Sequence, residues 1–295
     1  MTNKPIAIFD TTAINRFAEP NRADANRPLI AGLKSGFRLR ITATNVDEVI
    51  ATETGAIRER LLKVCQELAG AGEIIQPFHV ITERHITEFE KRGGTYDWRR
   101  VDVRAPEYER GFMYIDDDLS KAQRKHAAEV AAQFEQLYVD ARPAFEELFQ
   151  RSPEQRPASA ADLVKALQVP GGAFWAMGIK LYAAKAKNVP DEDTIRRFVH
   201  ACPPFRALLM ACFVAQHDRC DRTLTDAEQK KLAKRNDLFM SAYLPYCDEF
   251  ISDDRDQIRC LREVVCLANL NTEILWYGQL TERLAGNLPN AVTGS

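Results

Sequence analysis

Four acidic residues stand at positions from which their carboxylates could meet, although they are far apart in the chain: Asp10, Glu48, Asp237 and Asp254. Asp10 directly follows a short apolar run, and Asp254 closely follows a predicted strand near the other end. Glu48 comes soon after a third predicted strand. In open parallel sheets, ligands bind at the carboxyl ends of the strands. The sequence therefore predicts that these carboxylates share one edge of a sheet.

Converging carboxylates suit phosphodiester hydrolysis assisted by Mg²⁺ or Mn²⁺. This reaction needs a hydroxide near neutral pH and neutralisation of the charge that builds up on the phosphate, and a divalent cation supplies both. These hard cations take oxygen ligands and often keep several waters. Asp237 supports the interpretation, because its predicted helix places it on an apolar stripe, where an unpaired charge is costly to bury.

Each acid also has a purely structural interpretation. Asp10 could cap the helix that follows it. Glu48 could close a capping box with Asn45 as the cap, and Asp237 could favour a helix amino terminus through the helix dipole. Residues 253–256 could form a solvated turn. The order of the acids and their placement at strand ends favour the functional interpretation.

The elements that must position these acids are predicted strands at both ends of the chain and a helical block between them. The pattern is an α/β core, residues 1–80 and 205–295, interrupted by a helical insertion, residues 81–204. The expected strands are residues 6–9, 39–42, 73–76 and 249–252, and the expected core helices are residues 13–18, 44–69, 256–267 and 272–284.

The composition is that of an ordinary folded protein. Hydrophobic residues make up 45% and charged residues 28% of the 295 residues, which allows a sizeable buried core. The net charge of −2 gives no overall attraction to nucleic acid, so a nuclease would need local basic patches. We find no signal-peptide pattern and no apolar stretch near the roughly 20 residues that span a bilayer. We expect a cytoplasmic protein without a membrane partner.

Seven cysteines occur at irregular spacing, without a C-x-x-C pair. Several lie in apolar helical patterns, so we expect reduced thiols in the core. The alternative is a zinc site formed by Cys202, Cys212, His217 and Cys220, although structural zinc sites usually use tight ligand pairs that this spacing lacks.

Two basic stretches could contact a nucleic acid. Residues 91–104 hold five basic residues against two acidic ones, with aromatic side chains between them that could stack unpaired bases. The second stretch lies just before Asp237. Both could instead be solvated surface, with an aromatic anchor in the first. The candidate contacts are Lys91, Arg92, Trp98, Arg99, Arg100, Lys231 and Arg235.

Three blocks of the sequence together resemble the PIN-domain family of metal-dependent ribonucleases. "IAIFDTTAINRF" is similar to the family's opening strand with its first metal-binding Asp and a following Thr. "RLRITATNVDEVIA" resembles the second strand and the helix that bears the Glu. "KRNDLFMSAYLPYCDEFISDDRDQI" resembles the helix with the third acid and a strand that ends in Thr/Ser-x-Asp. The large helical insertion departs from the shorter toxin members of the family.

The resemblance implies a Rossmann-like, PIN-type parallel sheet of four or five short strands flanked by helices. It also implies cleavage of single-stranded RNA with Mg²⁺ or Mn²⁺, a homodimer, and an inhibitory antitoxin-like partner for the toxin members. The implied metal ligands are Asp10, Glu48, Asp237 and Asp254, with Asp256 assisting, and Thr11 and Ser252 would orient ligands or phosphate from behind them.

Two other functions fit parts of the pattern. A haloacid-dehalogenase-like phosphatase would use Asp10, Thr42 and Asp253 or Asp254, but it usually needs a second Asp where this chain has Thr12, which transfers a proton poorly. A catalytically inactive PIN-like module could instead bind RNA or protein through the helical insertion.

Overall fold

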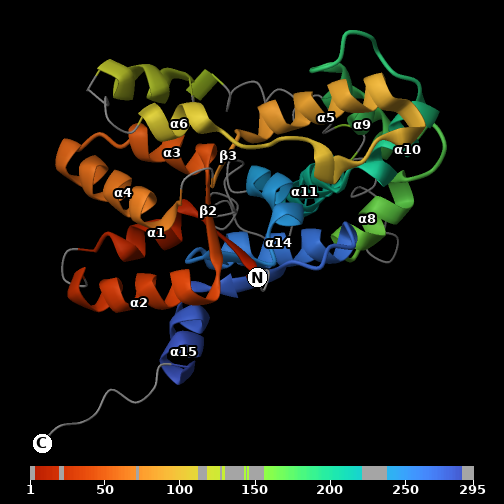
Figure 1. Ribbon diagram of the computed structural model, residues 1–295. Helices are drawn as coiled ribbons and strands as arrows, with labels where there is room; N and C mark the ends of the chain where they lie inside the picture. The colour runs from red at the N-terminus through yellow and green to blue at the C-terminus, as the bar shows by residue number, and fades with distance from the viewer. Residues whose placement is uncertain are drawn as a thin grey trace, which may run out of the picture.

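Five short strands form one parallel sheet in the computed structural model (Figure 1), which describes residues 4–19, 23–70, 73–111, 118–126, 128–129, 143, 145, 156–220 and 238–287. The strands are β1 Ile6–Phe9, β2 Arg38–Thr42, β3 Ile74–Ile75, β4 Glu249–Ser252 and β5 Glu273–Trp276. Their order across the sheet is β3-β2-β1-β4-β5, with β1 in the centre. All the pairings are parallel. The predicted α/β class with a Rossmann-like parallel sheet is therefore confirmed.

Side chains along each strand alternate between two hydrophobic cores, because successive strand residues point to opposite faces of a sheet. In β1, Ala7 and Phe9 belong to one core and Ile8 to the other. In β4, Phe250 and Ile251 divide in the same way. β1 and β4 are thus buried on both faces, which the wholly apolar composition of β1 predicts.

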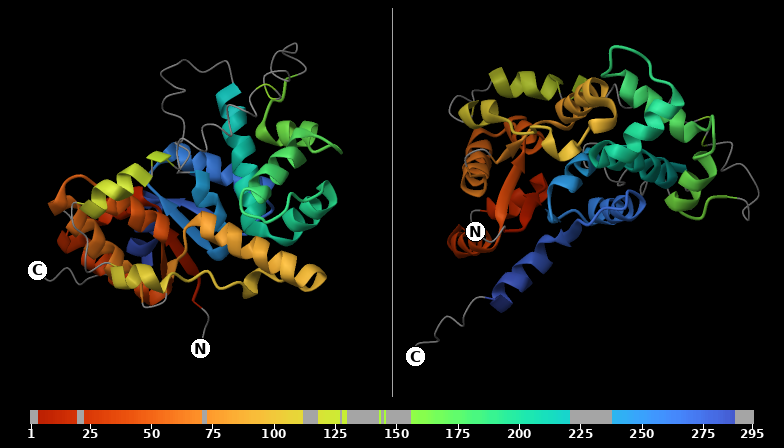
Figure 2. Two further views of the ribbon diagram at one scale, coloured as in Figure 1. Left: turned by 90° about the horizontal axis from the view of Figure 1, so that it is seen from above. Right: turned by 45° about the vertical axis from the view of Figure 1, so that its right-hand side comes forward.

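The helices form a layer on each face of the sheet (Figures 1 and 2). The first core takes side chains from α1 Thr11–Phe17, α2 Ala23–Gly36, α3 Ala43–Ile50, α4 Gly55–Leu68 and α15 Tyr277–Asn287. The second takes side chains from α5 Phe78–Arg92, α11 Pro203–Cys220, the 3-10 helix η5 Met240–Tyr246 and α14 Arg255–Leu267.

Every regular element described between residues 81 and 204 is helical. α8 Ala160–Leu167 and α10 Glu192–Ala201 pack on α11, and α9 Ala173–Ala183 packs on α10. The shorter elements are η2 Gly93–Thr95, η3 Trp98–Arg100, α6 Pro106–Gly111 and a helical segment at residues 118–126. Helix α5 runs through the predicted domain boundary at residue 80, and the second core continues from the sheet into α8, α9 and α10.

Two sequence predictions about the core helices are wrong. Residues 272–284 do not form one helix, because residues 273–276 pair with β4 as the edge strand β5 and the helix begins only at Tyr277. Buried Ile274 and Leu275 face opposite cores, which an edge strand between two helical layers allows. The predicted helix 44–69 is two helices, α3 and α4, separated at residues 51–54.

The strand order changes direction at β1, which makes the carboxyl ends of β1 and β4 the topological switch point of the sheet. The connections from β1 to β2 and β3 run over one face, whereas α14 connects β4 to β5 over the other. Right-handed crossovers that move in opposite directions must use opposite faces. Ligands bind at such a switch point in open α/β sheets.

Among the described helices, none alone combines the length and hydropathy needed to cross a membrane.

Candidate functional site

Asp10 lies at the switch point, where β1 ends. Its backbone N–H still bonds the carbonyl of Ile251 in β4 at 2.8 Å, so the strand pairing fixes its position. Its side chain, in a residue only 4% exposed, caps α1. Oδ2 of the carboxylate accepts the backbone N–H of Thr12 at 3.0 Å and the hydroxyl of Thr12 at 2.7 Å.

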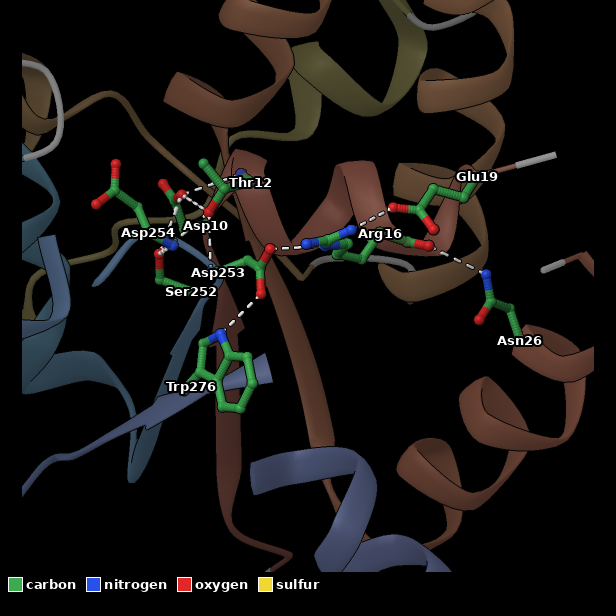
Figure 3. A network of polar contacts seen from close by, with 9 residues as sticks. All are labelled: Asp10, Thr12, Arg16, Glu19, Asn26, Ser252, Asp253, Asp254 and Trp276. Carbon is green, nitrogen blue, oxygen red and sulfur yellow. Dashed lines mark hydrogen bonds and ion pairs between the residues drawn. The ribbon is translucent and has the colours of Figure 1, made fainter. Parts of the chain in front are cut away.

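A directed chain of hydrogen bonds joins Asp254 to Asp10 (Figure 3). The backbone N–H of Asp254 donates to Oγ of Ser252 at 3.0 Å. Ser252 Oγ lies 3.1 Å from Thr12 Oγ1 and 3.5 Å from Asp10 Oδ2. Because the hydroxyl proton of Thr12 goes to Asp10, the Ser252 hydroxyl can donate to Thr12 Oγ1 or directly to Asp10 Oδ2, and by either route the chain ends on the Asp10 carboxylate. Thr12 Oγ1 also accepts the backbone N–H of Asp253 at 3.0 Å, which fixes the loop after β4.

Gln257 connects the same two acids from α14. Its amide Nε2 donates to Asp10 Oδ1 at 3.3 Å, and its residue is fully buried. The backbone N–H groups of Asp256 and Gln257 both donate to Asp254 Oδ1, at 2.8 and 3.0 Å, so Asp254 caps α14. The start of α14 is thereby held against the end of β1.

Glu48 receives a second directed chain, which begins at the end of β2. The hydroxyl of Thr42 donates to Asn45 Oδ1 at 2.7 Å, and Asn45 Nδ2 donates to Thr11 Oγ1 at 3.0 Å. Thr11 Oγ1 then donates to Glu48 Oε2. Since Thr11 directly follows Asp10, the two chains bring Asp10, Glu48, Ser252 and Asp254 to one edge of the sheet.

The structure confirms the helix cap predicted for Asp10 and contradicts the capping box predicted for Glu48. Asp10 and Asp254 do cap helices, so these two acids have a structural role as well. The capping box predicted with Asn45 as the cap and Glu48 as its partner is wrong, because Thr42 is the cap and Asn45 the partner. Asn45 is drawn inward by the bonds to Thr42 and Thr11, which leaves the carboxylate of Glu48 outside the capping of α3.

A cavity of about 260 Å³ opens beside Glu48. Phe78 and Phe239 stack with ring centroids 4.5 Å apart and both line it. Asp47 also lines it, and burial raises the pKa of Asp47 to about 7, although a hydrogen bond from the Tyr108 hydroxyl acts in the opposite direction. The full lining is Thr44, Asp47, Glu48, Ala51, Pro77, Phe78, His79, Gln123, His126 and Phe239.

Asp253 has different partners from its neighbour Asp254. Its Oδ2 accepts from Nε of Arg16 at 2.6 Å, and its Oδ1 accepts the indole N–H of Trp276 at 2.8 Å (Figure 3). Arg16 also pairs with Glu19 at 2.7 Å. The charge of Asp253 is therefore matched, whereas among the described residues neither Asp10 nor Asp254 pairs with a basic side chain.

Three of the predicted site residues, Asp237, Lys231 and Arg235, lie outside the described residues. The described chain resumes at Leu238, and Phe239 lines the cavity together with Glu48. Asp256 is exposed in the first turn of α14, next to Asp254.

The structure does not bring the basic stretch 91–104 to the carboxylates. Trp98 packs edge-to-face on Tyr246, with ring centroids 5.5 Å apart, and Tyr246 precedes β4. Trp98 thus lies near the amino end of that strand, whereas Asp254 follows its carboxyl end. Lys91 and Arg92 pair with Glu88, Arg100 pairs with Asp97, and Arg99 lies over the Trp98 ring. A role of these residues in RNA binding stays a prediction.

The donors at the sheet edge are of the kind that Mg²⁺ or Mn²⁺ prefers. Asp10, Glu48 and Asp254 offer carboxylate oxygens and no thiolate or imidazole. Among the described residues, no three His, Cys, Asp or Glu side chains form a group arranged to hold a metal ion. The chemistry of these oxygen donors therefore fits a hard cation. That Asp10, Glu48 and Asp254 surround one bound cation stays a prediction.

The six cysteines whose side chains are described are free thiols, and all except Cys266 are buried. This agrees with the prediction of core thiols. Cys202 and Cys212 of the alternative zinc site are among the buried thiols, and within the described residues they belong to no metal-binding group. The zinc alternative gains no support.

Thr12, Asn45 and Gln257 are the site residues that sequence reasoning missed. Gln257 could have been identified from the sequence, because helical spacing places it on the same face of α14 as buried Leu261 and Val264. A polar side chain on such a stripe needs a partner. Thr12 and Asn45 carry no comparable signal, since both are common at helix starts.

Comparison with known proteins gives no match to a family model, to a curated protein or to a solved structure.

Proposed function

We propose that this protein is a divalent-metal-dependent nuclease of the PIN type that cleaves single-stranded RNA endonucleolytically. The observation that carries the proposal is the pair of hydrogen-bond chains that end on Asp10 and Glu48 beside the switch point. Each chain runs from a strand end to a carboxylate and holds it at the edge where ligands bind. The proposal includes a cytoplasmic location.

The side chains at this edge have separable tasks in the proposed reaction. Asp10, Glu48, Asp237 and Asp254 would hold the ion, with Asp256 assisting. The ion would supply charge neutralisation on the phosphate and a hydroxide near neutral pH. Thr12, Ser252 and Gln257 orient the Asp10 carboxylate, and Thr11 orients Glu48. This arrangement matches the general finding that residues behind metal ligands fix their orientation.

Burial of Asp10 without a basic partner supports a bound cation. An ionised carboxylate removed from water is costly unless it is hydrogen-bonded and matched in charge. Asp10 is 4% exposed and has hydrogen-bond donors, and no described lysine, arginine or histidine pairs with it. A divalent cation would match the charge.

A phosphatase of the haloacid-dehalogenase type is the weaker candidate. It would need the hydroxyl of Thr42 to face a phosphate, but Thr42 is fully buried and its hydroxyl bonds Asn45 in the cap of α3. It would also need a proton donor at the position of Thr12, whose hydroxyl instead orients Asp10. The positions of Thr42 and Thr12 therefore do not favour the phosphatase.

Cleavage by the wild type and by an Asp10→Asn variant tests the proposal. With a labelled single-stranded RNA and Mg²⁺ or Mn²⁺, the wild type should give internal cleavage products, and the variant should keep its circular dichroism spectrum and lose cleavage. An exposed acid on α10, outside the candidate site, as in Asp193→Asn, is the matched control and should cleave normally. Hydrolysis of p-nitrophenyl phosphate without RNA products would favour the phosphatase, and RNA binding without cleavage would favour an inactive binding module.

A further inference from the structure

Trp276 is one of the large apolar side chains that remain exposed among the described residues. It ends β5, the strand next to β4, so it reaches the same edge of the sheet as Asp254. Its residue is 36% exposed, whereas Trp175 is 5% exposed and Trp98 packs on Tyr246. An indole at the rim of a candidate active site has a face with which a planar ligand group could stack.

A hydrogen bond and a close approach to a glycine fix the Trp276 ring at this place. Its N–H donates to Asp253 at 2.8 Å, and Asp253 is held by Arg16 and by the hydroxyl of Thr12 (Figure 3). Gly278 gives the ring its space, because a Cβ there would come within 2.4 Å of the ring atom Cζ3. The ring is thus positioned through the same network that positions Asp10.

Arg255 completes the surface. It follows Asp254 directly, is exposed, and its guanidinium carbon lies 5.5 Å from the centre of the Trp276 ring. Among the described residues no carboxylate pairs with it, whereas Arg16, Arg259 and Arg283 all pair with acids. An arginine without a carboxylate partner can bind a phosphate and stack on a base.

We propose that Trp276 and Arg255 form a nucleotide-binding subsite, in which an unpaired RNA base stacks on the indole and Arg255 contacts the adjoining phosphate. This inference rests on the proposed function and names the feature of the substrate that the site selects, an unstacked base near the cleavage position. Duplex RNA keeps its bases stacked inside the helix and cannot use the subsite.

Binding measured apart from cleavage tests the subsite. In an Asp10→Asn background, the affinity for a fluorescein-labelled 12-nucleotide single-stranded RNA is measured by anisotropy. Trp276→Ala should weaken binding between about 5-fold and 140-fold, the range for loss of one base–aromatic stack. Trp276→Phe should restore most of the affinity. Arg255→Ala should lower the slope of log affinity against log salt by about 0.7, as expected for one lost phosphate contact to a single strand. Arg197→Ala on α10 should leave affinity and slope unchanged.

A second readout does not depend on the folding of the alanine variant. RNA should quench the tryptophan fluorescence of the Asp10→Asn protein, and the quenching should be lost with Trp276→Phe, although that variant still binds. Equal affinity of Trp276→Ala, unchanged quenching with Trp276→Phe, or equal binding of single-stranded and duplex RNA would overturn the subsite. Failure of the proposed function would look different, as the absence of metal-dependent cleavage by the wild type.

Discussion

Replacing Thr12 with valine should destabilise the protein and disorganise the candidate site at once. Valine has nearly the same shape but lacks the hydroxyl that donates to Asp10 at 2.7 Å and accepts from the Asp253 N–H at 3.0 Å. A hydrogen bond to a charged group contributes about 1.5–3 kcal/mol and a neutral one about 1 kcal/mol. We therefore expect the free energy of unfolding to fall by about 3 kcal/mol.

Urea denaturation at pH 7, followed by circular dichroism, measures this loss, and an unchanged m-value would show that the two-state comparison holds. Thr12→Ser keeps the hydroxyl and removes only a methyl group, so it should lose about 1 kcal/mol or less. RNA cleavage should be reduced in Thr12→Val, which lacks the hydroxyl, and should persist in Thr12→Ser, which keeps it. A valine variant as stable as the wild type, or a serine variant as unstable as valine, would refute the role given to this hydroxyl.

His85 is fully buried on α5, and burial lowers its pKa to about 4. The neutral imidazole therefore costs no stability above the unfolded-state pKa near 6.5, and the free energy of unfolding falls as the pH drops from there toward 4. In urea titrations, the free energy of unfolding of the wild type should fall by about 2 kcal/mol between pH 8 and pH 5, and His85→Gln should not show this fall. Wild type and variant with the same dependence of this free energy on pH would contradict the prediction. Glu48→Gln should reduce RNA cleavage in a gel assay by at least about 100-fold, the upper end of the range for residues that only orient metal ligands, with Asp193→Asn as the control. EDTA should abolish wild-type cleavage and added Mg²⁺ or Mn²⁺ should restore it, so cleavage that persists in EDTA excludes the metal. Gly278→Ala should displace the Trp276 ring, shift its emission and weaken RNA binding, whereas an unchanged spectrum would remove the steric argument.

The central strands were predictable because they are buried on both faces. The run at β1 is wholly apolar, and β4 holds the apolar pair Phe250 and Ile251, so the sequence pattern identified both strands and the acids that follow them. The edge strand β5 was not predictable in this way. Its four residues, Glu273–Trp276, place two buried apolar residues between two exposed ends, so they offer no alternation that could outweigh the helical pattern that follows.

The candidate site was predictable in its acids and not in the bonds between them. Asp10 and Asp254 follow strands, so the topology of a parallel sheet brings them together. The bonds through Thr12 and Asn45 depend on side-chain directions that only the folded backbone fixes. The subsite at Trp276 was invisible for the same reason, because its strand was assigned to a helix.

Anomalous diffraction from crystals soaked in Mn²⁺ tests the central claim most directly. The account predicts a manganese peak at the carboxyl ends of β1 and β4, within coordinating distance of oxygens from Asp10, Glu48 and Asp254. A well-ordered sheet edge with these carboxylates resolved and no manganese between them, at an Mn²⁺ concentration that supports cleavage, would contradict it.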